Sequence, residues 1–528
     1  MRIHELGATE LRDKLDRGEL SAREIVDALH ARAEHLNPSF HAIVVDLHEA
    51  AVADANRADQ ERARGEANGA LHGIPITVKE SLDIAGVDTT LGVPGWRGRP
   101  ATEDAVVVDA ARAAGAIVLG KTNVPQSLLS PLETTNPIWG TTPNPWNAAR
   151  APGGSSGGEA VSLASGMSPL GLGTDVGGSI RLPAAFTGTA GLKPTAGRWS
   201  NVGSRSSIGG QEFVRAQVGP MARNARDVAF LFGALDVGRM AARDGAVPPL
   251  PIARPDHVDL GGLTVGFYET DGFIEPSPSV RRAVREAVKA IEARGARVVE
   301  YTPPHADDLL YLYLAAVSAD GGAHVRRHLA GDSIIDPLKL VKLAADMPSP
   351  ARRALARTMS LAGEKRIARL LEAVGAKDVD AFWSLTRERD AMLRDEQSAW
   401  DAAKLDAVIC PAQTTPAVGH GQGKDFILSF TYAARYNFLN RPAGVVPVTC
   451  VRPGEEQRPD AKDRFDKRAQ SIEAKSEGLP IGVQVVGRAW REDVVLALMI
   501  AIEDTAREHP DFPKTPITPN GHSLPPTA

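Results

Sequence analysis

The sequence predicts an α/β fold: a single large domain with a central mixed, mostly parallel β-sheet covered by helices on both faces. Leu263–Tyr268, Val280–Gly295 and Arg297–Tyr301 have the patterns of a strand, an amphipathic helix and a second strand. Such a β-α-β unit places its two strands in parallel in one sheet. Short apolar runs at Ile74–Lys79 and Ala407–Pro411 are typical of further buried strands.

Length and composition narrow the class of protein. With 528 residues, 43% of them hydrophobic, the chain can bury a large core. A prior of about 150 residues per domain suggests three or four domains, but no linker interrupts the chain, so we expect residues 1–528 to form one. The net charge of −5 lacks the basic excess that nucleic-acid binding requires. Two cysteines, Cys410 and Cys450, exclude a disulfide framework and a cysteine-rich metal site.

The chain is predicted to open with helices and to alternate between helices and strands. Ser21 and Glu24 form a capping-box pattern that starts the second helix. The first twenty residues are charged throughout, so we expect neither a signal peptide nor a membrane span there, and a cytoplasmic protein. The predicted regions are N-terminal helices (1–64), a catalytic core (65–236), a helical cap (about 305–400), C-terminal core strands and a helix (405–508) and a tail (509–528).

The helices and strands expected within these regions follow from the periodicity of hydrophobic residues and from the glycine and proline residues that interrupt it. Helices are expected at 9–36 (two), 49–64, 104–114, 159–165, 225–235, 307–371 and 380–404, and further strands at 116–119, 444–451 and 480–486. Tight turns are expected at 188–194 and 218–222, loops at 127–146 and 236–255, and an exposed or mobile charged insertion at 453–477.

The run Ala151–Arg181 is the most informative stretch. It holds two serines flanked by glycines, Ser155 and Ser179, separated by 24 positions. Glycine permits close backbone approach, so such a loop can direct several N–H groups at one point. A hydroxyl beside converging N–H donors is what acyl transfer needs. A flexible Gly/Ser linker is the alternative, which the interspersed apolar stretches disfavour.

A serine nucleophile needs a base, and lysine is the better candidate here. None of the thirteen histidines lies in a glycine-rich or strand-end motif, and His72 is expected to be a turn residue. Burial favours the neutral amine of lysine, and Lys79 ends an apolar strand. A surface lysine that buries only its stem is the competing interpretation. Lys79, Ser155 and Ser179 together would make a proton relay that needs neither a metal nor a cofactor.

Two other motif matches are rejected because their context is wrong. Gly115–Thr122 fits the phosphate-binding pattern G-x-x-x-x-G-K-[ST], but its middle residues form a predicted strand instead of a loop. Gly154–Gly158 fits G-x-S-x-G, but no hydrophobic strand precedes it, so Ser156 is not predicted to be a nucleophile.

Three features of the sequence are the upstream Lys79, then Gly-Gly-Ser155-Ser-Gly-Gly, and then Gly-Thr-Asp-Val-Gly-Gly-Ser179-Ile-Arg. In this order they resemble the motifs of the amidase signature family, and the likeness runs from about residue 5 to residue 508. The resemblance implies Ser179 as the acylated nucleophile, Ser155 as a bridging serine after a cis peptide bond, and Lys79 as the base. It further implies an oxyanion hole from the backbone N–H groups of Val176, Gly177, Gly178 and Ser179, and a structural ion pair of Asp175 with Arg181.

Within that family, the chain is most similar to fatty acid amide hydrolases. The likeness rests on Lys121–Ser127, Ser168–Asp175, Asn440–Pro447 and Gly478–Gln484. It implies a small apolar amide as substrate and a homodimer. Leu128 and Pro131 stand where those enzymes carry Met and Phe, so both are expected to shape the acyl-binding pocket. We expect no counterpart here of the N-terminal membrane helix of the mammalian enzymes, so any membrane contact would come from the helices at 338–369.

Three alternatives stay open. A glutamine-amidase subunit of a tRNA-dependent amidotransferase would use the same chemistry with partner proteins. A non-catalytic binding protein could also use this fold, because fold alone does not prove function. The basic helices at 338–369 are interpreted as an ordinary solvated pair, and the alternative is an amphipathic cap that contacts an apolar entrance or a membrane surface.

Overall fold

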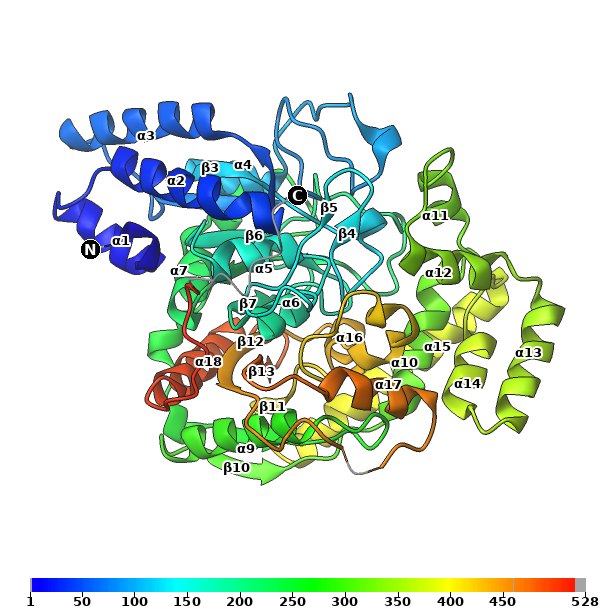
Figure 1. Cartoon of the computed structure of the whole chain (residues 1–528). Coiled ribbons are helices and arrows are strands. Elements are labelled where there is room, and N and C mark those ends of the chain that lie inside the picture. The colour runs from blue at the N-terminus through cyan, green and yellow to red at the C-terminus, as the bar shows by residue number, and fades with distance from the viewer. Residues whose placement is uncertain (1, 459, 518–528) are drawn as a thin grey trace.

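An eleven-stranded sheet forms the centre of the computed structural model, which describes residues 2–458 and 460–517 (Figure 1). Its strand order is β1-β3-β2-β6-β8-β7-β12-β13-β11-β9-β10, and β4 and β5 form a separate small sheet. The strands are β1 (Ile43–Asp46), β2 (Pro75–Lys79), β3 (Ile117–Thr122), β4 (Thr135–Asn136), β5 (Gly140–Thr141), β6 (Leu170–Asp175), β7 (Ala190–Lys193), β8 (Gln217–Ala222), β9 (Thr264–Phe267), β10 (Arg297–Glu300), β11 (Ala407–Pro411), β12 (Ala443–Cys450) and β13 (Pro480–Gly487).

The mixed sheet within one large α/β domain is confirmed. β9 and β10 pair in parallel, as the predicted β-α-β unit requires. Parallel pairing also joins β2 to β3 and to β6, and β9 to β11. The remaining pairs in this sheet are antiparallel, so the sheet is less parallel than predicted.

Much of the difference comes from β7 and β8, which were predicted as tight turns. Both lie in the middle of the sheet and are buried throughout. An ideal Cβ on Gly219 would lie 2.1 Å from the Leu192 carbonyl oxygen, and one on Gly191 would lie 2.6 Å from Ile180 Cγ2. The glycines that made these segments look like turns are therefore needed for close strand packing.

Helices cover both faces of this sheet, as predicted. α7, α9 and α18 pack on one side of the strands, and α5 and α6 pack on the other (Figure 1). In chain order, the helices are α1 (Ala8–Asp16), α2 (Ala22–Phe40), α3 (His48–Ala63), α4 (Val106–Ala113), α5 (Gly157–Ala164), α6 (Arg181–Thr187), α7 (Ala225–Ala234), α8 (Val237–Ala241), α9 (Pro278–Glu292), α10 (Ala306–Val317), α11 (Ala323–His328), α12 (Asp336–Asp346), α13 (Ser349–Leu361), α14 (Lys365–Ala373), α15 (Val379–Ala402), α16 (Thr431–Phe438), α17 (Arg464–Glu473) and α18 (Glu492–Ala506). The Ser21–Glu24 capping box begins α2 as predicted.

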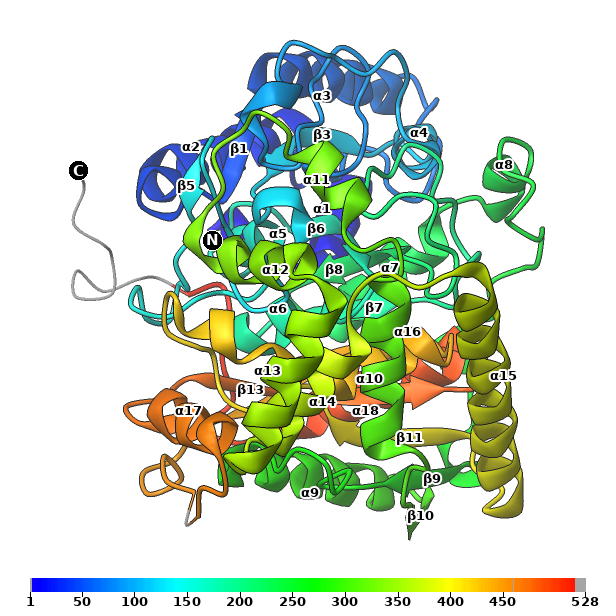
Figure 2. The same cartoon turned by 90° about the vertical axis from the view of Figure 1, so that its right-hand side faces the viewer.

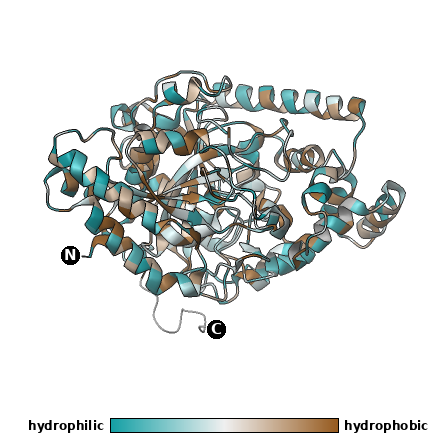
Figure 3. Ribbon diagram, turned by 90° about the horizontal axis from the view of Figure 1, so that it is seen from above, coloured by the Kyte–Doolittle hydropathy of each residue, from teal (hydrophilic) through white to brown (hydrophobic). Residues whose placement is uncertain are grey.

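The predicted helical cap is present as α10–α15, which stand in front of the sheet in Figure 2. Its outer helices carry hydrophobic and hydrophilic residues side by side, as Figure 3 shows for the periphery of the molecule. Leu361, at the end of α13, is 91% exposed. Among the described residues, no helix combines the length and the apolar character needed to cross a membrane.

The charged insertion at 453–477 was predicted to be exposed or mobile, and this is wrong for its second half. That half contains α17, whose Phe465 stacks on Phe426 with ring centroids 4.4 Å apart. Arg458 and Glu473 form a buried ion pair across the segment. Charged residues hid this packing because they bond to one another and leave the apolar face of α17 free to pack.

Candidate active site

Lys79 is the last residue of β2, and its side chain is completely buried. Its Nζ donates to Ser155 Oγ at 2.7 Å and to Thr174 Oγ1 at 2.8 Å. A longer contact of 3.3 Å reaches the Thr174 carbonyl. Strand β2 runs beside β6, which ends at Asp175, so neighbouring strands bring the lysine to the glycine-rich loop.

Burial lowers the pKa of Lys79 from 10.5 to about 7. The negative charges of Asp175, Glu159 and Glu80 act in the opposite direction and raise it. Glu159 is itself buried, and burial raises its pKa to about 7 although hydrogen bonds from Thr77 and Thr122 lower it. Lys79 is thus close to the balance between ammonium and neutral amine at neutral pH, which suits a general base.

Ser155 lies at the start of the segment that leads into α5, after a cis peptide bond with Gly154. An ideal Cβ on Gly154 would lie 2.4 Å from the Ser130 carbonyl oxygen, so glycine is required here. The Gly154 N–H donates to the Pro131 carbonyl at 2.9 Å. Pro131 was expected to shape the substrate pocket. Its carbonyl supports the backbone that precedes Ser155, and Pro131 is not among the residues that line the cavity described below.

Ser179 lies in the turn between β6 and α6, and this turn is organised by Asp175. The Asp175 carboxylate accepts the N–H of Gly178 at 2.7 Å and that of Ile180 at 3.1 Å. Arg181 donates to it from Nε and Nη2, both at 3.0 Å, and both side chains are fully buried. Burial by itself would raise the pKa of Asp175, but Arg181 and these hydrogen bonds hold it well below its usual range. The expected structural ion pair is confirmed.

The backbone donors expected to form an oxyanion hole are not all free. The Gly178 N–H is engaged by Asp175, so it cannot also point at a substrate oxygen. The N–H groups of Val176, Gly177 and Ser179 find no acceptor in the part of the chain that the structure describes. Three of the four expected donors therefore remain available for a developing negative charge.

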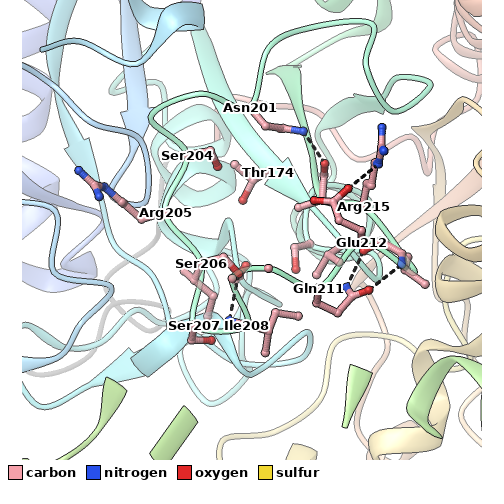
Figure 4. A pocket seen from close by; sticks show the side chains of 18 of the residues that line it. Thr174, Asn201, Ser204, Arg205, Ser206, Ser207, Ile208, Gln211, Glu212 and Arg215 are labelled. Atoms are coloured by element: carbon pink, nitrogen blue, oxygen red, sulfur yellow. Dashed lines mark hydrogen bonds and ion pairs between the residues drawn. The ribbon is translucent and has the colours of Figure 1, made fainter. Parts of the chain in front are cut away.

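Ser155, Ser179, Leu128 and Val176 line one cavity of about 310 Å³. Most of its remaining wall comes from a single segment, residues 197–216. In Figure 4 every labelled side chain except Thr174 belongs to that segment. Deep within it, Trp199 is buried, whereas Arg205 and Arg215 are exposed at the mouth and paired with Asp83 and Glu212.

His72, Lys121 and Ser156, which were rejected as functional residues on the basis of the sequence, have structural roles. His72 Nε2 lies 3.0 Å from Glu61 Oε2, away from the cavity. Lys121, from the false phosphate-binding motif, is buried in β3 and donates to the Asp88 carbonyl at 2.7 Å. Ser156 is buried and absent from the cavity lining, with its Oγ 3.4 Å from the Thr174 carbonyl.

Sequence analysis missed four residues that hold the site in place: Thr174, Tyr313, Asn437 and Gln484. Thr174 holds Lys79, and Gln484 accepts a hydrogen bond from Arg181. Tyr313 donates to the Val176 carbonyl, and Asn437 donates to Asp175. Three of the four come from elements more than 130 positions beyond the loop, and no local motif marks them.

Comparisons with known proteins identify the family of this chain. A family model described as Amidase matches residues 24–496, and the chain belongs to the amidase family. It is 35% identical over 509 residues to fatty-acid amide hydrolase 1 of Sus scrofa, which covers 94% of this chain and 84% of that protein. A solved structure of a fatty acid amide hydrolase superposes with a TM-score of 0.84 at 27% identity, over 96% of this chain and 85% of the other. A glutamyl-tRNA(Gln) amidotransferase subunit of Roseiflexus sp. (strain RS-1) is 31% identical over 531 residues, 98% of this chain and 99% of the relative.

Proposed function

We propose that this amide-hydrolysing enzyme cleaves the C–N bond of apolar carboxylic amides, fatty acyl or aryl, and accepts esters and carbamates as well. The reaction would run through an acyl-enzyme on Ser179. The observation that carries this proposal is the 2.7 Å hydrogen bond from a buried Lys79 to Ser155, at the cavity that also holds Ser179.

The proposed relay moves a proton from Ser179 through Ser155 to Lys79 and later returns it to the leaving nitrogen. Neutral Lys79 takes the proton of Ser155 while Ser155 takes that of Ser179, and the Ser179 oxygen attacks the substrate carbonyl. The carbonyl oxygen becomes negative and is bound by the free N–H groups of the loop. When the C–N bond breaks, the proton returns through Ser155 to the leaving nitrogen. A water molecule then attacks the ester on Ser179 by the same route and releases the acid.

An apolar substrate is supported by part of the cavity lining. Leu128, Val176, Trp199 and Val214 are apolar residues of this lining, which also contains many polar side chains. The similarity to proteins named fatty acid amide hydrolases points to the same class of compound. Burial of apolar surface contributes about 25 cal/mol per Å², so each buried methylene of a substrate should add measurably to binding.

The test uses purified enzyme with oleamide and with an aryl anilide, with amine release as the measurement. Wild-type protein should release amine from at least one of them and should react covalently with a fluorophosphonate probe. Ser179→Ala should abolish both, whereas Ser156→Ala, the matched serine outside the cavity, should keep the labelling. Continued amine release by Ser179→Ala would refute the mechanism.

A second candidate is the glutamine-hydrolysing subunit of a tRNA-dependent amidotransferase. The similarity to the Roseiflexus amidotransferase protein over nearly the full length of both chains supports it. Expression of the tagged chain in its own host, followed by purification at low salt, distinguishes the two. Stoichiometric partner proteins and activity on glutamine would favour the amidotransferase.

We further propose a homodimer, which the resemblance implies, and retain peripheral membrane contact through 338–369 as the alternative to the solvated helical pair favoured from the sequence. Exposed Leu343 and Leu361 lie on α12 and α13 beside exposed lysines and arginines. Sedimentation with anionic vesicles tests the membrane contact, and analytical ultracentrifugation tests the dimer.

A further inference from the structure

Two consecutive peptide groups beside the nucleophile are held on their carbonyl side by side chains from distant helices. Asn437 Nδ2, on α16, donates to the carbonyl oxygen of Asp175 at 3.2 Å. Tyr313 Oη, on α10, donates to the carbonyl oxygen of Val176 at 3.0 Å. These helices reach the loop from the cap and from the region before β12, more than 130 positions away in the chain.

Because each peptide bond is planar, a hydrogen bond to its carbonyl oxygen also fixes the direction of its N–H group. In a trans peptide the C=O and the N–H point in opposite directions within one rigid plane. Both peptide bonds concerned are trans, since the cis bonds of the described chain lie elsewhere. The bond from Asn437 to Asp175 therefore sets the direction of the Val176 N–H. The bond from Tyr313 to Val176 sets that of the Gly177 N–H.

Of the three free donors, Ser179 follows the Gly178 carbonyl, which already accepts the Leu182 N–H at 2.7 Å. Val176 and Gly177 are therefore the two donors whose orientation depends on the distant side chains. Gly178 and Ile180 donate to the Asp175 carboxylate, so their peptide planes are already fixed by hydrogen bonds. Val176 and Gly177 have no acceptor among the described residues. Asp175 ends β6 and pairs with Gln217 of β8, whereas the Val176 carbonyl lies beyond the strand and among the described residues accepts a hydrogen bond from Tyr313 alone.

The packing around Tyr313 fits this role. The tyrosine is 5% exposed, and its ring meets Phe430 edge-on with centroids 5.8 Å apart. An ideal Cβ on Gly177 would lie 2.8 Å from Tyr313 Oη, so the glycine is what allows the hydroxyl to come so close. Asn437 is 4% exposed and also donates to Asp175 Oδ1 at 2.9 Å.

We propose that Tyr313 and Asn437 are positioning residues of the oxyanion site. They act through the backbone, holding the Val176 and Gly177 N–H groups in the direction that the negative oxygen of the transition state requires. Donors that are already oriented need no reorganisation when the charge develops, which is how such sites accelerate a reaction. This inference rests on the proposed acylation of Ser179.

The decisive variant is Tyr313→Phe, which removes one hydroxyl and keeps the ring against Phe430. Loss of this one hydrogen bond should lower kcat by about 3- to 10-fold. KM should stay within about twofold, because the ground-state carbonyl carries little charge. A trifluoromethyl ketone, which forms a charged tetrahedral adduct with a serine, should bind more weakly by a similar factor.

Tyr311→Phe is the matched control. Tyr311 lies on the same helix, is equally 5% exposed, and donates to a backbone carbonyl, that of Arg366, at 3.1 Å. It has no contact with the loop, so its removal should leave kcat and inhibitor binding within about twofold. Asn437→Ala provides a second arm and should lower kcat further, because it also removes a bond to the Asp175 carboxylate. Thermal unfolding of each variant identifies those that merely fold poorly.

Three results would overturn the inference: an unchanged kcat in Tyr313→Phe, a higher KM with an unchanged kcat, or an equal loss in Tyr311→Phe. Fluorophosphonate labelling separates this from failure of the proposed function. An unlabelled wild-type Ser179 would refute the proposed nucleophile. A labelled wild type with equally fast labelling of Tyr313→Phe would refute only the positioning role.

Discussion

Replacement of Lys79 by methionine should inactivate the enzyme and, below about pH 8.5, make it more stable. Methionine has a similar length and no charge, so it fills the same space beside Ser155 and Thr174. Burial disfavours the protonated form of Lys79, so the folded state is destabilised at any pH at which this lysine is protonated in the unfolded chain. Methionine carries no charge and removes this free-energy penalty.

The magnitude follows from the pKa, which is about 7 in the folded protein against 10.5 for the free side chain. Above pH 10.5 neither state binds the proton, and the penalty is absent. Between pH 10.5 and about 7 only the unfolded state binds it, so wild-type stability rises with pH by about 1.4 kcal/mol per unit. Below pH 7 the full penalty of about 5 kcal/mol is present. The lost hydrogen bonds of Lys79 offset about 2 to 3 kcal/mol of this, which leaves a net gain of about 2 kcal/mol at pH 6.

The assay is urea unfolding of wild type and Lys79→Met at pH 6, 7, 8 and 9. Their difference in unfolding free energy should be flat up to pH 7 and then fall, changing sign near pH 8.5. Lys193→Met is the matched control, because burial also lowers the pKa of Lys193 to about 7 and its Nζ bonds only to the Pro194 carbonyl among the described residues. It should show the same pH dependence and retain activity. A Lys79→Met protein that is less stable at pH 6, or a difference independent of pH, would refute the reasoning.

Two further predictions concern the relay and the loop. Lys79→Ala should slow amide cleavage at least tenfold more than cleavage of a matched ester, because only the departing amine needs the returned proton; equal losses in kcat/KM would contradict the relay. Asp175→Asn should destabilise the protein by about 3 to 5 kcal/mol, because it leaves the fully buried Arg181 without its counter-charge. Urea unfolding at pH 7 measures this, and an unchanged midpoint would show that the pair is not needed for stability.

The groups proposed to react could be selected from the sequence, because each lies in a strong local pattern. Lys79 ends a run of β-branched residues, and the two serines stand among glycines at a characteristic separation. The ion pair of Asp175 with Arg181, on either side of Ser179, was expected from the resemblance to the amidase signature family. These features depend on residues that are neighbours in the chain.

The residues that support the site could not be found in this way. Tyr313 and Asn437 reach the loop only because α10 and α16 pack against it, and neither residue stands in a distinctive motif. The same limit explains the error at β7 and β8, where glycine reflects close packing in the middle of the sheet instead of a turn. Pro131 was assigned to the pocket by analogy, and no local motif indicates that its carbonyl accepts the Gly154 N–H.

The wall of the cavity has a consequence for how substrate preference could diverge. The groups proposed to react come from separate strands and turns of the buried core, but most of the surrounding wall is one continuous stretch, residues 197–216. Exchange of that stretch between relatives would alter the shape and charge met by a substrate while the proton relay stays intact. Small local insertions and substitutions in this one segment should therefore change selectivity without replacing the residues of the proposed relay.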